Sequence, residues 1–490
     1  MRLKDKNMKN FGLKIIRFAL IIGLFIGLVS FLIPKAYHNL LDPSLKDREL
    51  MKNSSRSEKS GWILIHLEGK PEAVGYQQGS LLADEIADAF KALKPFLEYT
   101  THRNWAFYHD TAKDHFWAKI DPEYQAEIDG IVEGLASKGK VFDRYDIAAL
   151  NGYMELSDYY VPQLDEKIHP GSGNNKAPGN CSAFIANGKY TEDGKIVMGH
   201  NNWTDYALGE RWNIIVDIKP EKGNRIYMDS FPGFIHSGDD FVENEAGILI
   251  TETTITQFKG FDIDAVPEFV RARKAAQYSK SIDDFIQIMN EGNNGGYAND
   301  WLIGDTKTNE IARLELGLKN HPVWRSKDGI YYGSNFASDP KLIKEETTFD
   351  PLDKTSSPNT RKVRYEELIE KEKGKINIKI GKILESDHYD VILNKNAGTR
   401  SVICGHMDED SHGTPEWDKP AYYPEGAVQG KLTTADLASK MQFWAHMGHP
   451  CGEDFLAVPF LKKHPEFNWQ KDYLTDMKSY PWTLMDANKP

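Results

Sequence analysis

A break at residues 162–180 constrains this chain more than any other feature of its sequence. Nine of its nineteen residues are proline, glycine or asparagine, which favour turns and disfavour the interior of helices and of central strands. We therefore expect a loop that leads directly to Cys181 and separates two differently patterned parts of the chain.

Before the break, apolar residues recur every three or four positions, which predicts helices at 75–99, 121–137 and 144–160. After Cys181 the chain contains short runs of β-branched and apolar residues typical of strands. Strands are expected at 182–187, 195–199, 212–218, 247–251, 301–305, 311–316 and 329–333, and helices at 267–278, 281–291, 361–373 and 434–446. Such grouping predicts an α+β fold in which helices cover antiparallel sheets.

The N-terminus has the pattern of a targeting segment. Residues 1–17 form a basic flank with six lysine or arginine residues and one acidic residue, and residues 18–34 are an apolar run closed by proline. We favour a signal anchor over a cleaved signal peptide, because no clear cleavage site follows; a buried core helix is the remaining alternative. Residues 35–60 are polar and predict a linker. The catalytic part would then lie on the extracytoplasmic or lumenal side, or be secreted.

Charge and cysteine content narrow the functional classes. The formal net charge of −12 argues against nucleic acid as a partner. The chain has three cysteines, an odd number, so an exported form could pair two of them and leave one reactive. Cys404 and Cys451 could form that disulfide and leave Cys181 free, although three free thiols are also compatible with the sequence.

A thiol at the start of a strand, after a Gly/Asn-rich loop, is suited to self-cleavage. Cys181 could attack the carbonyl of the preceding residue and release a new α-amino group. That amine has an ordinary pKa near 7.7–8.0, so it can accept the thiol proton without a histidine base. The alternative for an isolated cysteine beside a strand is a small buried apolar residue.

Several separate motifs of the chain resemble one known protein family. The run Asn180-Cys181-Ser182-Ala183 and the segment 199–206 resemble the nucleophile region of the phospholipase B-like proteins, a family of N-terminal-nucleophile hydrolases. Further similar segments lie at 231–233, 237–241, 251–255, 297–301 and 444–450. Because they occur in the same order, together they are more specific than any single motif.

Other segments resemble the related cysteine acyltransferases, which include the penicillin acyltransferase. They are Gly75–Gly79, Arg361 with Arg364, residues 401–406 and residues 448–451. The two resemblances together cover residues 61–455. They imply an αββα sandwich of two stacked antiparallel sheets between helical layers, with an N-terminal helical part at 61–180 and a catalytic part at 181–490.

The resemblance also implies roles for individual residues. Cleavage would fall between Asn180 and Cys181, and Cys181 would be the nucleophile. His200 would lie near the thiol or the leaving group, and Asn299 would donate to the oxyanion. Their alternatives are a structural histidine and a turn-forming asparagine. The expected substrate-binding residues are Asn201, Trp203 and Thr253.

The resulting functional prediction is a hydrolase that cleaves acyl amide or ester bonds through a thioester. The implied substrate is an acyl-containing small molecule or a lipid, and no cofactor is expected. Acyl transfer to an amine acceptor and a non-catalytic extracellular binding module are the alternatives. His406, Asp408, Asp410 and His412 resemble a metal cluster, but no HExxH or CxxC pattern accompanies them, so we expect no metal. The oligomeric state stays open.

Overall fold

The computed structural model describes residues 43–169 and 181–489, which fall into two compact units. The first unit ends at Lys52, and its described part contains α3 (Pro43–Leu50). The predicted basic flank, the predicted anchor at 18–34 and the predicted cleavage residue Asn180 lie outside the described residues. Within the described ranges, no helix is both long and apolar enough to cross a membrane.

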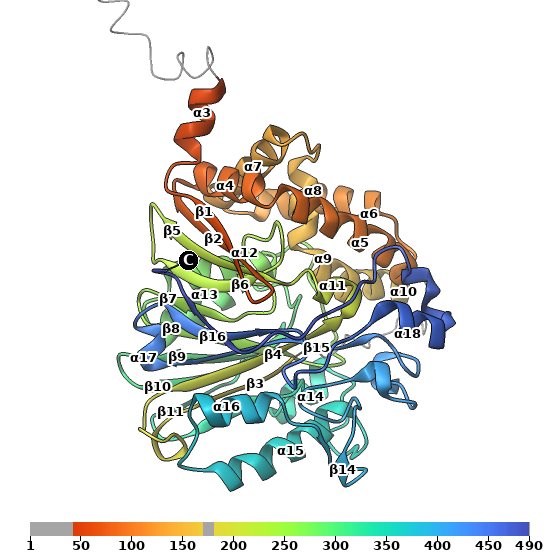
Figure 1. The fold of residues 1–490 in the computed structure, drawn as a ribbon. Helices are drawn as coiled ribbons and strands as arrows, with labels where there is room; N and C mark the ends of the chain where they lie inside the picture. Colours follow the sequence, from red (N-terminus) through yellow and green to blue (C-terminus); the bar gives the residue numbers. More distant parts are fainter. Residues whose placement is uncertain (1–42, 170–180, 490) are drawn as a thin grey trace, which may run out of the picture. The chain divides into compact units, whose positions relative to one another are not determined.

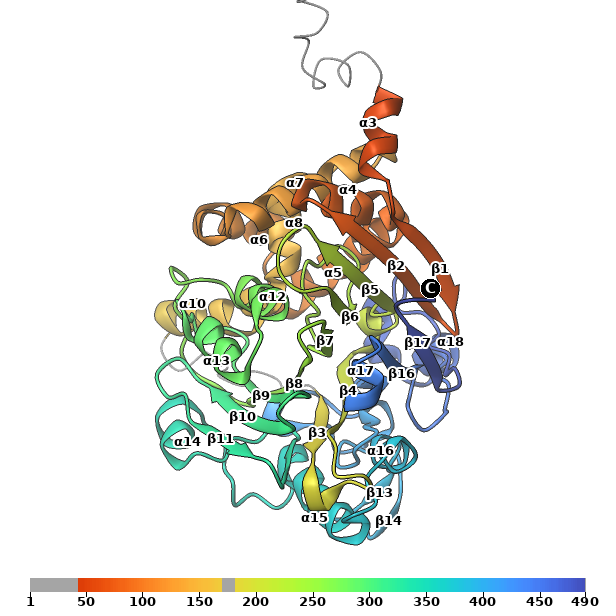
Figure 2. The ribbon, with the colours of Figure 1, turned by 90° about the vertical axis from the view of Figure 1, so that its left-hand side faces the viewer.

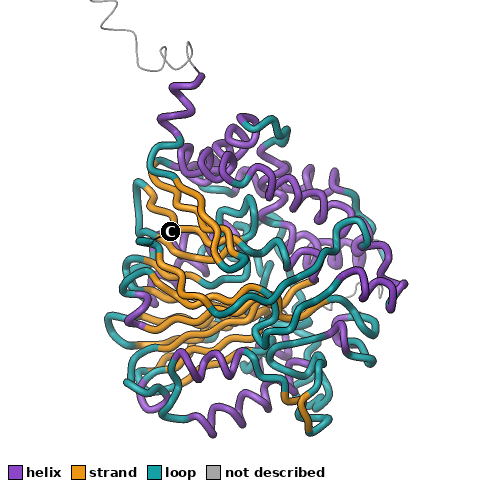
Figure 3. The backbone as a smooth tube through the Cα atoms, in the orientation of Figure 1, coloured by secondary structure: helices purple, strands orange, loops and turns teal. Residues whose placement is uncertain are grey.

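The second unit, residues 53–490, is built around two sheets that run through its middle (Figures 1 and 3). In the larger sheet β2 and β5 are parallel and the other neighbours are antiparallel. Its nine strands lie in the order β1 (Ser55–Lys59), β2 (Trp62–Gly69), β5 (Ile214–Pro220), β6 (Ile226–Ser230), β7 (Val242–Asn244), β8 (Ile248–Thr254), β9 (Asn299–Asp305), β10 (Glu310–Leu316), β11 (Val323–Ser326).

The smaller sheet carries the strand that follows Cys181, and all its neighbours are antiparallel. Its six strands lie in the order β12 (Ile330–Gly333), β3 (Ser182–Ala186), β4 (Val197–Asp205), β15 (Glu425–Thr434), β16 (Gln442–Met447), β17 (Thr483–Asp486). A separate short hairpin joins β13 (Tyr389–Asp390) to β14 (Lys395–Asn396).

Alternation along the strands divides the described interior into three large apolar cores, and a fourth, small cluster surrounds Trp203. On β3, Ala183 and Ile185 belong to the core between the sheets, whereas Phe184 and Ala186 belong to the core on the opposite face. That outer core is covered by α15 (Ser357–Glu372) and α16 (Ile378–Glu385), which lie below the smaller sheet in Figures 1 and 2.

The third core lies between the larger sheet and the helices that cover its outer face. Its helices include α4 (Pro71–Leu81), α5 (Ala83–Thr101), α7 (Pro122–Ser137), α8 (Arg144–Asn151), α12 (Glu268–Tyr278) and α13 (Ile282–Asn290). The predicted fold class, two stacked sheets between helical layers, is therefore confirmed. The remaining α-helices are α6 (Trp105–Thr111), α9 (Tyr153–Glu155), α10 (Val161–Ile168), α11 (Tyr206–Gly209), α14 (Pro340–Glu346), α17 (Ala435–Ala438) and α18 (Ala457–Lys463).

Glycines explain the close contact between α4 and α7. A Cβ placed on Gly75 would lie 1.8 Å from the carbonyl oxygen of Glu127, and one on Gly79 would lie 2.1 Å from that of Ile131. Only a residue without a side chain allows the two backbones to approach so closely. The Gly75–Gly79 motif is thus a packing motif in this fold.

Four local predictions were wrong. The stretch 75–99 forms two helices, α4 and α5, and the expected linker 35–60 includes β1, an exposed polar strand at the sheet edge. The expected loop 162–180 begins as α10, because Pro162 sits in the first turn, where its missing N–H has no helical partner. The expected helix 434–446 shortens to α17, and the chain continues as β16, whose pairing with β15 and β17 overrides the helical propensity.

Candidate active site

Cys181 immediately precedes β3, and its side chain is fully buried. Its backbone has φ of 84°, in the left-handed region that favours glycine. A non-glycine residue held in such a conformation costs on the order of 1–3 kcal/mol, and this strain concentrates at functional positions. The strain adjoins the peptide bond at which the sequence predicts cleavage.

Three reactive side chains converge at this position. The Cys181 sulfur, a ring nitrogen of His200 and a carboxylate oxygen of Glu252 all lie within 4.8 Å of one another. His200 lies on β4, where it pairs with Ala183 of β3, and Glu252 lies on β8 of the other sheet. Both ring nitrogens of His200 lack a hydrogen-bond partner within the described protein, although the ring is fully buried. The two sheets therefore bring a thiol, an imidazole and a carboxyl group together.

The buried surroundings favour the uncharged form of each group. Burial raises the pKa of the Cys181 thiol well above its ordinary value, and the charges of Glu252 and Asp239 add to this; the backbone N–H of Trp203 acts in the opposite direction. Burial lowers the pKa of His200 and raises the pKa of Glu252, which Asp240 and Asp239 raise further. In the intact chain the Cys181 thiol is therefore protonated.

Arg361 of α15 holds the backbone at Cys181. Its Nη1 donates to the carbonyl oxygen of Cys181 at 2.8 Å and to the Ser182 hydroxyl at 2.9 Å. Its Nη2 donates to Asn335 at 2.7 Å, and its guanidinium carbon lies 4.1 Å from the centre of the Trp203 ring. Burial lowers its pKa to about 9. These contacts fix the direction in which Cys181 enters β3.

A fully buried lysine lies beside His200. Lys431 of β15 stands directly across from His200 in the register, and its Nζ is 2.5 Å from carboxylate oxygens of both Asp229 and Asp239. The hydroxyl of Ser237 donates to Asp229 at 2.9 Å. The charged network explains the Ser237–Phe241 motif and supplies part of the electrostatic field at Cys181.

Two of the residues expected to bind substrate, Asn201 and Trp203, lie on the face of β4 opposite His200. Asn201 donates to the carbonyl oxygen of Glu385 at 2.7 Å, and the Trp203 indole donates to that of Ile403 at 3.2 Å. Both side chains point toward the α15 and α16 side, whereas His200 points between the sheets. The main chain of Trp203, rather than its ring, faces the thiol.

Thr253 and Asn299 lie on the larger sheet, next to Glu252. The Thr253 hydroxyl is buried and has no hydrogen-bond partner within the described chain. With its amide nitrogen turned toward Glu252, Asn299 donates to that carboxyl at 3.0 Å and to the Ala298 carbonyl at 3.1 Å. Asn299 therefore contacts the Cys181 centre through Glu252, and Tyr297 donates to the same carboxyl at 3.3 Å.

The disulfide that the sequence allowed is not formed in the structure. Cys404 and Cys451 are free thiols, as is Cys181. Their sulfur atoms lie within 4.8 Å of each other and of ring nitrogens of His388 and His406. Of the four residues in the predicted metal-like cluster, only His406 belongs to this group.

Glu252, Arg361 and Lys431 were not among the predicted site residues. Glu252 and Arg361 belong to motifs that carry the family resemblances, but a glutamate and an arginine alone gave no reason to place them beside Cys181. Lys431 lies in the middle of β15, where no strand was predicted, so nothing in the sequence analysis marked it as a buried charge that needs a partner. Its partners lie about two hundred residues away in sequence.

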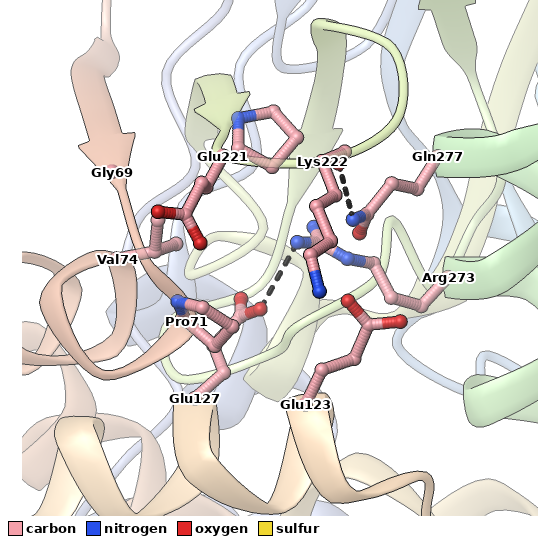
Figure 4. A pocket seen from close by; sticks show the side chains of 10 residues that line it. Gly69, Pro71, Val74, Glu123, Glu127, Glu221, Lys222, Arg273 and Gln277 are labelled. Carbon is pink, nitrogen blue, oxygen red and sulfur yellow. Dashed lines mark hydrogen bonds and ion pairs between the residues drawn. The ribbon is translucent and has the colours of Figure 1, made fainter.

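A cavity lies among α4, α7 and α12 (Figure 4). Arg273 and Glu127 form a buried ion pair of 3.0 Å on its wall, and Gln277 donates to the Lys222 carbonyl at 2.8 Å. The described residues that line it include no cysteine, serine or threonine. It belongs to the helical side of the larger sheet, away from the layer that holds Cys181.

Comparison with known proteins shows which family this chain is similar to. The phospholipase B family model matches residues 81–324. The predicted resemblance to the phospholipase B family is confirmed. The phospholipase B match includes Cys181, His200, Glu252 and Asn299, and it ends before Arg361 and Lys431.

Curated relatives carry the same family name. A phospholipase B-like 1 protein of Caenorhabditis elegans is 22% identical over 427 residues, 76% of this chain and 72% of that protein. Phospholipase B-like 1 of Bos taurus is 25% identical over 268 residues (48% of each chain), and phospholipase B of Crotalus adamanteus is 26% identical over 282 residues (50% of each chain). Apart from the nematode protein, the matches span about half the length of these relatives or less.

Among solved structures, a variant of the conjugated bile acid hydrolase from Clostridium perfringens aligns with 55% of this chain and 89% of that chain. The sequence identity is 13% and the TM-score is 0.32, so the assignment of fold rests on the layers and sheets themselves. The phospholipase B relatives support the broad class of hydrolase.

Proposed function

We propose that this protein is a self-cleaving cysteine hydrolase that acts on acyl amide or ester bonds. The observation that carries the proposal is the convergence of the Cys181 sulfur, His200 and Glu252 immediately before β3. The thiol is buried in the uncut chain, so an attack on the adjoining peptide bond needs no access from solvent. The family match supports a hydrolase and leaves the nucleophile to be tested.

Self-cleavage would proceed in two steps, formation of a thioester and its hydrolysis. The Cys181 sulfur attacks the carbonyl carbon of Asn180, the C–N bond breaks, and the thiol proton passes to the departing nitrogen. This exchange leaves a thioester and a free α-amine. Water then attacks the thioester, which releases the Asn180 carboxylate and regenerates the thiol. Arg361 is suited to hold Cys181 in the strained conformation during the first step.

The mature enzyme would use the same sulfur on an acyl substrate. The new α-amine accepts the thiol proton while the sulfur attacks the acyl carbonyl, and it then protonates the leaving amine or alcohol. Water hydrolyses the resulting thioester to a carboxylic acid. The backbone N–H of Trp203 lies beside the sulfur, where it can stabilise the oxyanion; Asn299 remains a second candidate for this role.

The proposed substrates are acyl-containing small molecules or lipids, and the chemistry uses no cofactor. The relatives named as phospholipase B favour a lipid ester. A sulfur nucleophile with an amine base suits amides as well. The proposed location of residues 53–490 is the extracytoplasmic or lumenal side of a membrane, or outside the cell, as the N-terminal pattern predicts.

The first test is the size of the mature protein on a denaturing gel, with wild type beside Cys181→Ala. We expect two fragments that meet at the Asn180–Cys181 bond in wild type and one intact chain in the variant. N-terminal sequencing of the larger fragment should begin at Cys181. An intact wild-type chain after long incubation at mildly acidic and neutral pH would contradict self-cleavage.

A second test separates hydrolysis from the alternatives. Processed protein is incubated with a labelled acyl amide or acyl ester, with and without an amine acceptor. Release of free acid in both conditions supports a hydrolase, whereas acyl label on the acceptor supports a transferase. A Cys181 that takes up no acyl label from either donor, in a protein that has been cleaved, would favour the binding module.

A further inference from the structure

Four side chains converge at a place that the proposed catalysis does not use. They are His388, just before β13; Cys404 and His406, on either side of Gly405; and Cys451, in the turn after β16. One nitrogen or sulfur atom from each lies within 4.8 Å of all the others. The Nε2 atoms of the two histidines are 2.9 Å apart, and the Cys451 sulfur is 3.7 Å from the His406 Nε2.

These spacings are close to the edges of a zinc tetrahedron. Zinc binds sulfur at roughly 2.3 Å and imidazole nitrogen at roughly 2.0–2.1 Å. A tetrahedron with those bond lengths has edges of about 3.3 Å between nitrogens and about 3.8 Å between sulfurs. Two thiolates and two imidazoles in tetrahedral spacing are a donor set that selects zinc over calcium or magnesium.

The site is supported by the backbone around it. The Cys404 N–H donates to the Asp387 carbonyl at 3.1 Å, and the His406 N–H donates to the Thr399 carbonyl at 3.1 Å. Gly405 has φ of 58°, and a Cβ there would lie 2.1 Å from the Trp203 ring. Cys404 and His406 are buried, and His388 and Cys451 are half-buried. A metal ion could therefore reach the site from solvent on one side.

We propose that His388, Cys404, His406 and Cys451 bind one structural zinc ion. The ion would join the segment 385–406 to the turn at 448–452. Apart from the short hairpin β13–β14, the segment 385–406 has little regular structure. Because Asn201 and Trp203 of β4 donate to carbonyls of Glu385 and Ile403, the ion would also brace the strand that carries His200. The ligands are spread over the sequence, which is why no CxxC or HExxH pattern marks them.

The proposal is independent of the proposed catalysis. It needs no reaction at Cys181, and a protein that is never cleaved would still bind the ion. The alternative state of the same residues is a Cys404–Cys451 disulfide, which would remove both thiolates. A second group, Cys181 with His200 and Glu252, could also attract a metal ion, so the experiment must separate the two.

The test uses the full chain, purified without a polyhistidine tag, dialysed against Zn²⁺ and then against metal-free buffer. Elemental analysis should find about one zinc per chain. The Cys404→Ser/Cys451→Ser double variant should lose it. Cys181→Ala should retain it, because that change disrupts only the other group. His412→Ala should also retain it, because His412 lies nearby but outside the cluster, with a side chain 75% exposed.

If the double variant does not fold, cobalt substitution in the unmodified chain tests the proposal instead. Replacement of zinc by Co²⁺ should give the intense visible absorption of a tetrahedral site and a thiolate-to-metal band in the near ultraviolet. Cys451 should react with a thiol reagent only after a chelator has removed the metal. A chain that retains no zinc and shows no tetrahedral cobalt spectrum would overturn the proposal. Mass spectrometric detection of a Cys404–Cys451 disulfide in the unreduced protein would also overturn it.

Discussion

The two faces of β4 have opposite characters. On the face between the sheets, His200 lies beside Cys181, with Glu252 opposite it and the charged Lys431 next to it on β15. On the other face, Asn201 and Trp203 make hydrogen bonds to the backbone of the segment that carries Cys404 and His406. Because side chains alternate between the faces of a strand, His200 points to one side of β4, and Asn201 and Trp203 point to the other.

The comparison teaches that burial has different consequences on the two faces. Between the sheets, ionisable groups are placed close together with few hydrogen bonds, which shifts their pKa values. On the outer face the amide nitrogen of Asn201 and the indole of Trp203 donate to backbone carbonyls, and neither side chain titrates. Along β4 itself, the inner face therefore carries the titratable side chain and the outer face carries side chains that anchor the backbone.

The largest expected effect comes from removing the charge that neutralises the inner face. Lys431→Met leaves Asp229 and Asp239 buried without a cation, and breaking a buried pair in this way costs about 3–5 kcal/mol. Urea unfolding, measured in a Cys181→Ala background that cannot be cleaved, should show a much lower midpoint. Lys195→Met is the control, because its partner Asp436 is exposed. Equal midpoints for the two variants would contradict this account of the inner face.

The next effect comes from the outer face. Arg361→Lys keeps a positive charge but loses the fork that holds the Cys181 carbonyl, the Ser182 hydroxyl and Asn335. Loss of a charged hydrogen bond of about 1.5–3 kcal/mol should slow self-cleavage by roughly 10–100-fold. The time course of fragment appearance on a gel measures it. Arg364→Lys, on the same helix but bound to Asp387, should leave the rate nearly unchanged.

A smaller, pH-dependent effect tests the buried carboxyl. Burial raises the pKa of Glu252, so the folded chain favours its protonated form. The stability that this group contributes is fully present below about pH 4 and is lost as the pH rises through the raised value. Glu252→Gln, which stays neutral, should therefore reduce the loss of stability between pH 5 and pH 8. Thermal midpoints at both pH values measure this, with the exposed Glu58→Gln as control.

The smallest effect concerns the link between the two faces. Trp203→Phe removes the indole N–H that donates to Ile403 and should cost about 1 kcal/mol. Asn201 still donates to the same carbonyl at 3.4 Å, so the segment 385–406 should stay in place and the zinc content should not change. A variant that loses zinc would show that the indole, rather than the ligands, organises the cluster.

The sequence predicted what depends on local pattern. The run at 182–187 alternates between two buried faces, and the proline- and glycine-rich stretch before Cys181 marks the boundary between the helical and the strand-rich parts. Each of the seven predicted strands overlaps an observed one, although several are shifted or longer. The family resemblance supplied Cys181 and His200, which the fold places together.

What could not be predicted depends on contacts between distant segments. The stretch 434–446 contains good helix formers, yet pairing with two neighbouring strands makes its last five residues part of β16. Glu252 reaches Cys181 only because β8 and β3 lie in sheets that stack. The four proposed zinc ligands come from three loops between 388 and 451, and no spacing rule relates them.

The parallel pairing of β2 with β5 has a consequence for any nicked form of the molecule. β2 lies before the proposed cut and β5 after it, and seven consecutive residue pairs join them from Ile63–Ile214 to Gly69–Pro220. If the chain is cut before Cys181, β2 and β5 belong to two different polypeptides, and their pairing becomes part of the interface between them. Those polypeptides would elute together under native conditions and separate only when unfolded. Neither piece could refold alone, because each would expose a sheet edge and half of a shared core.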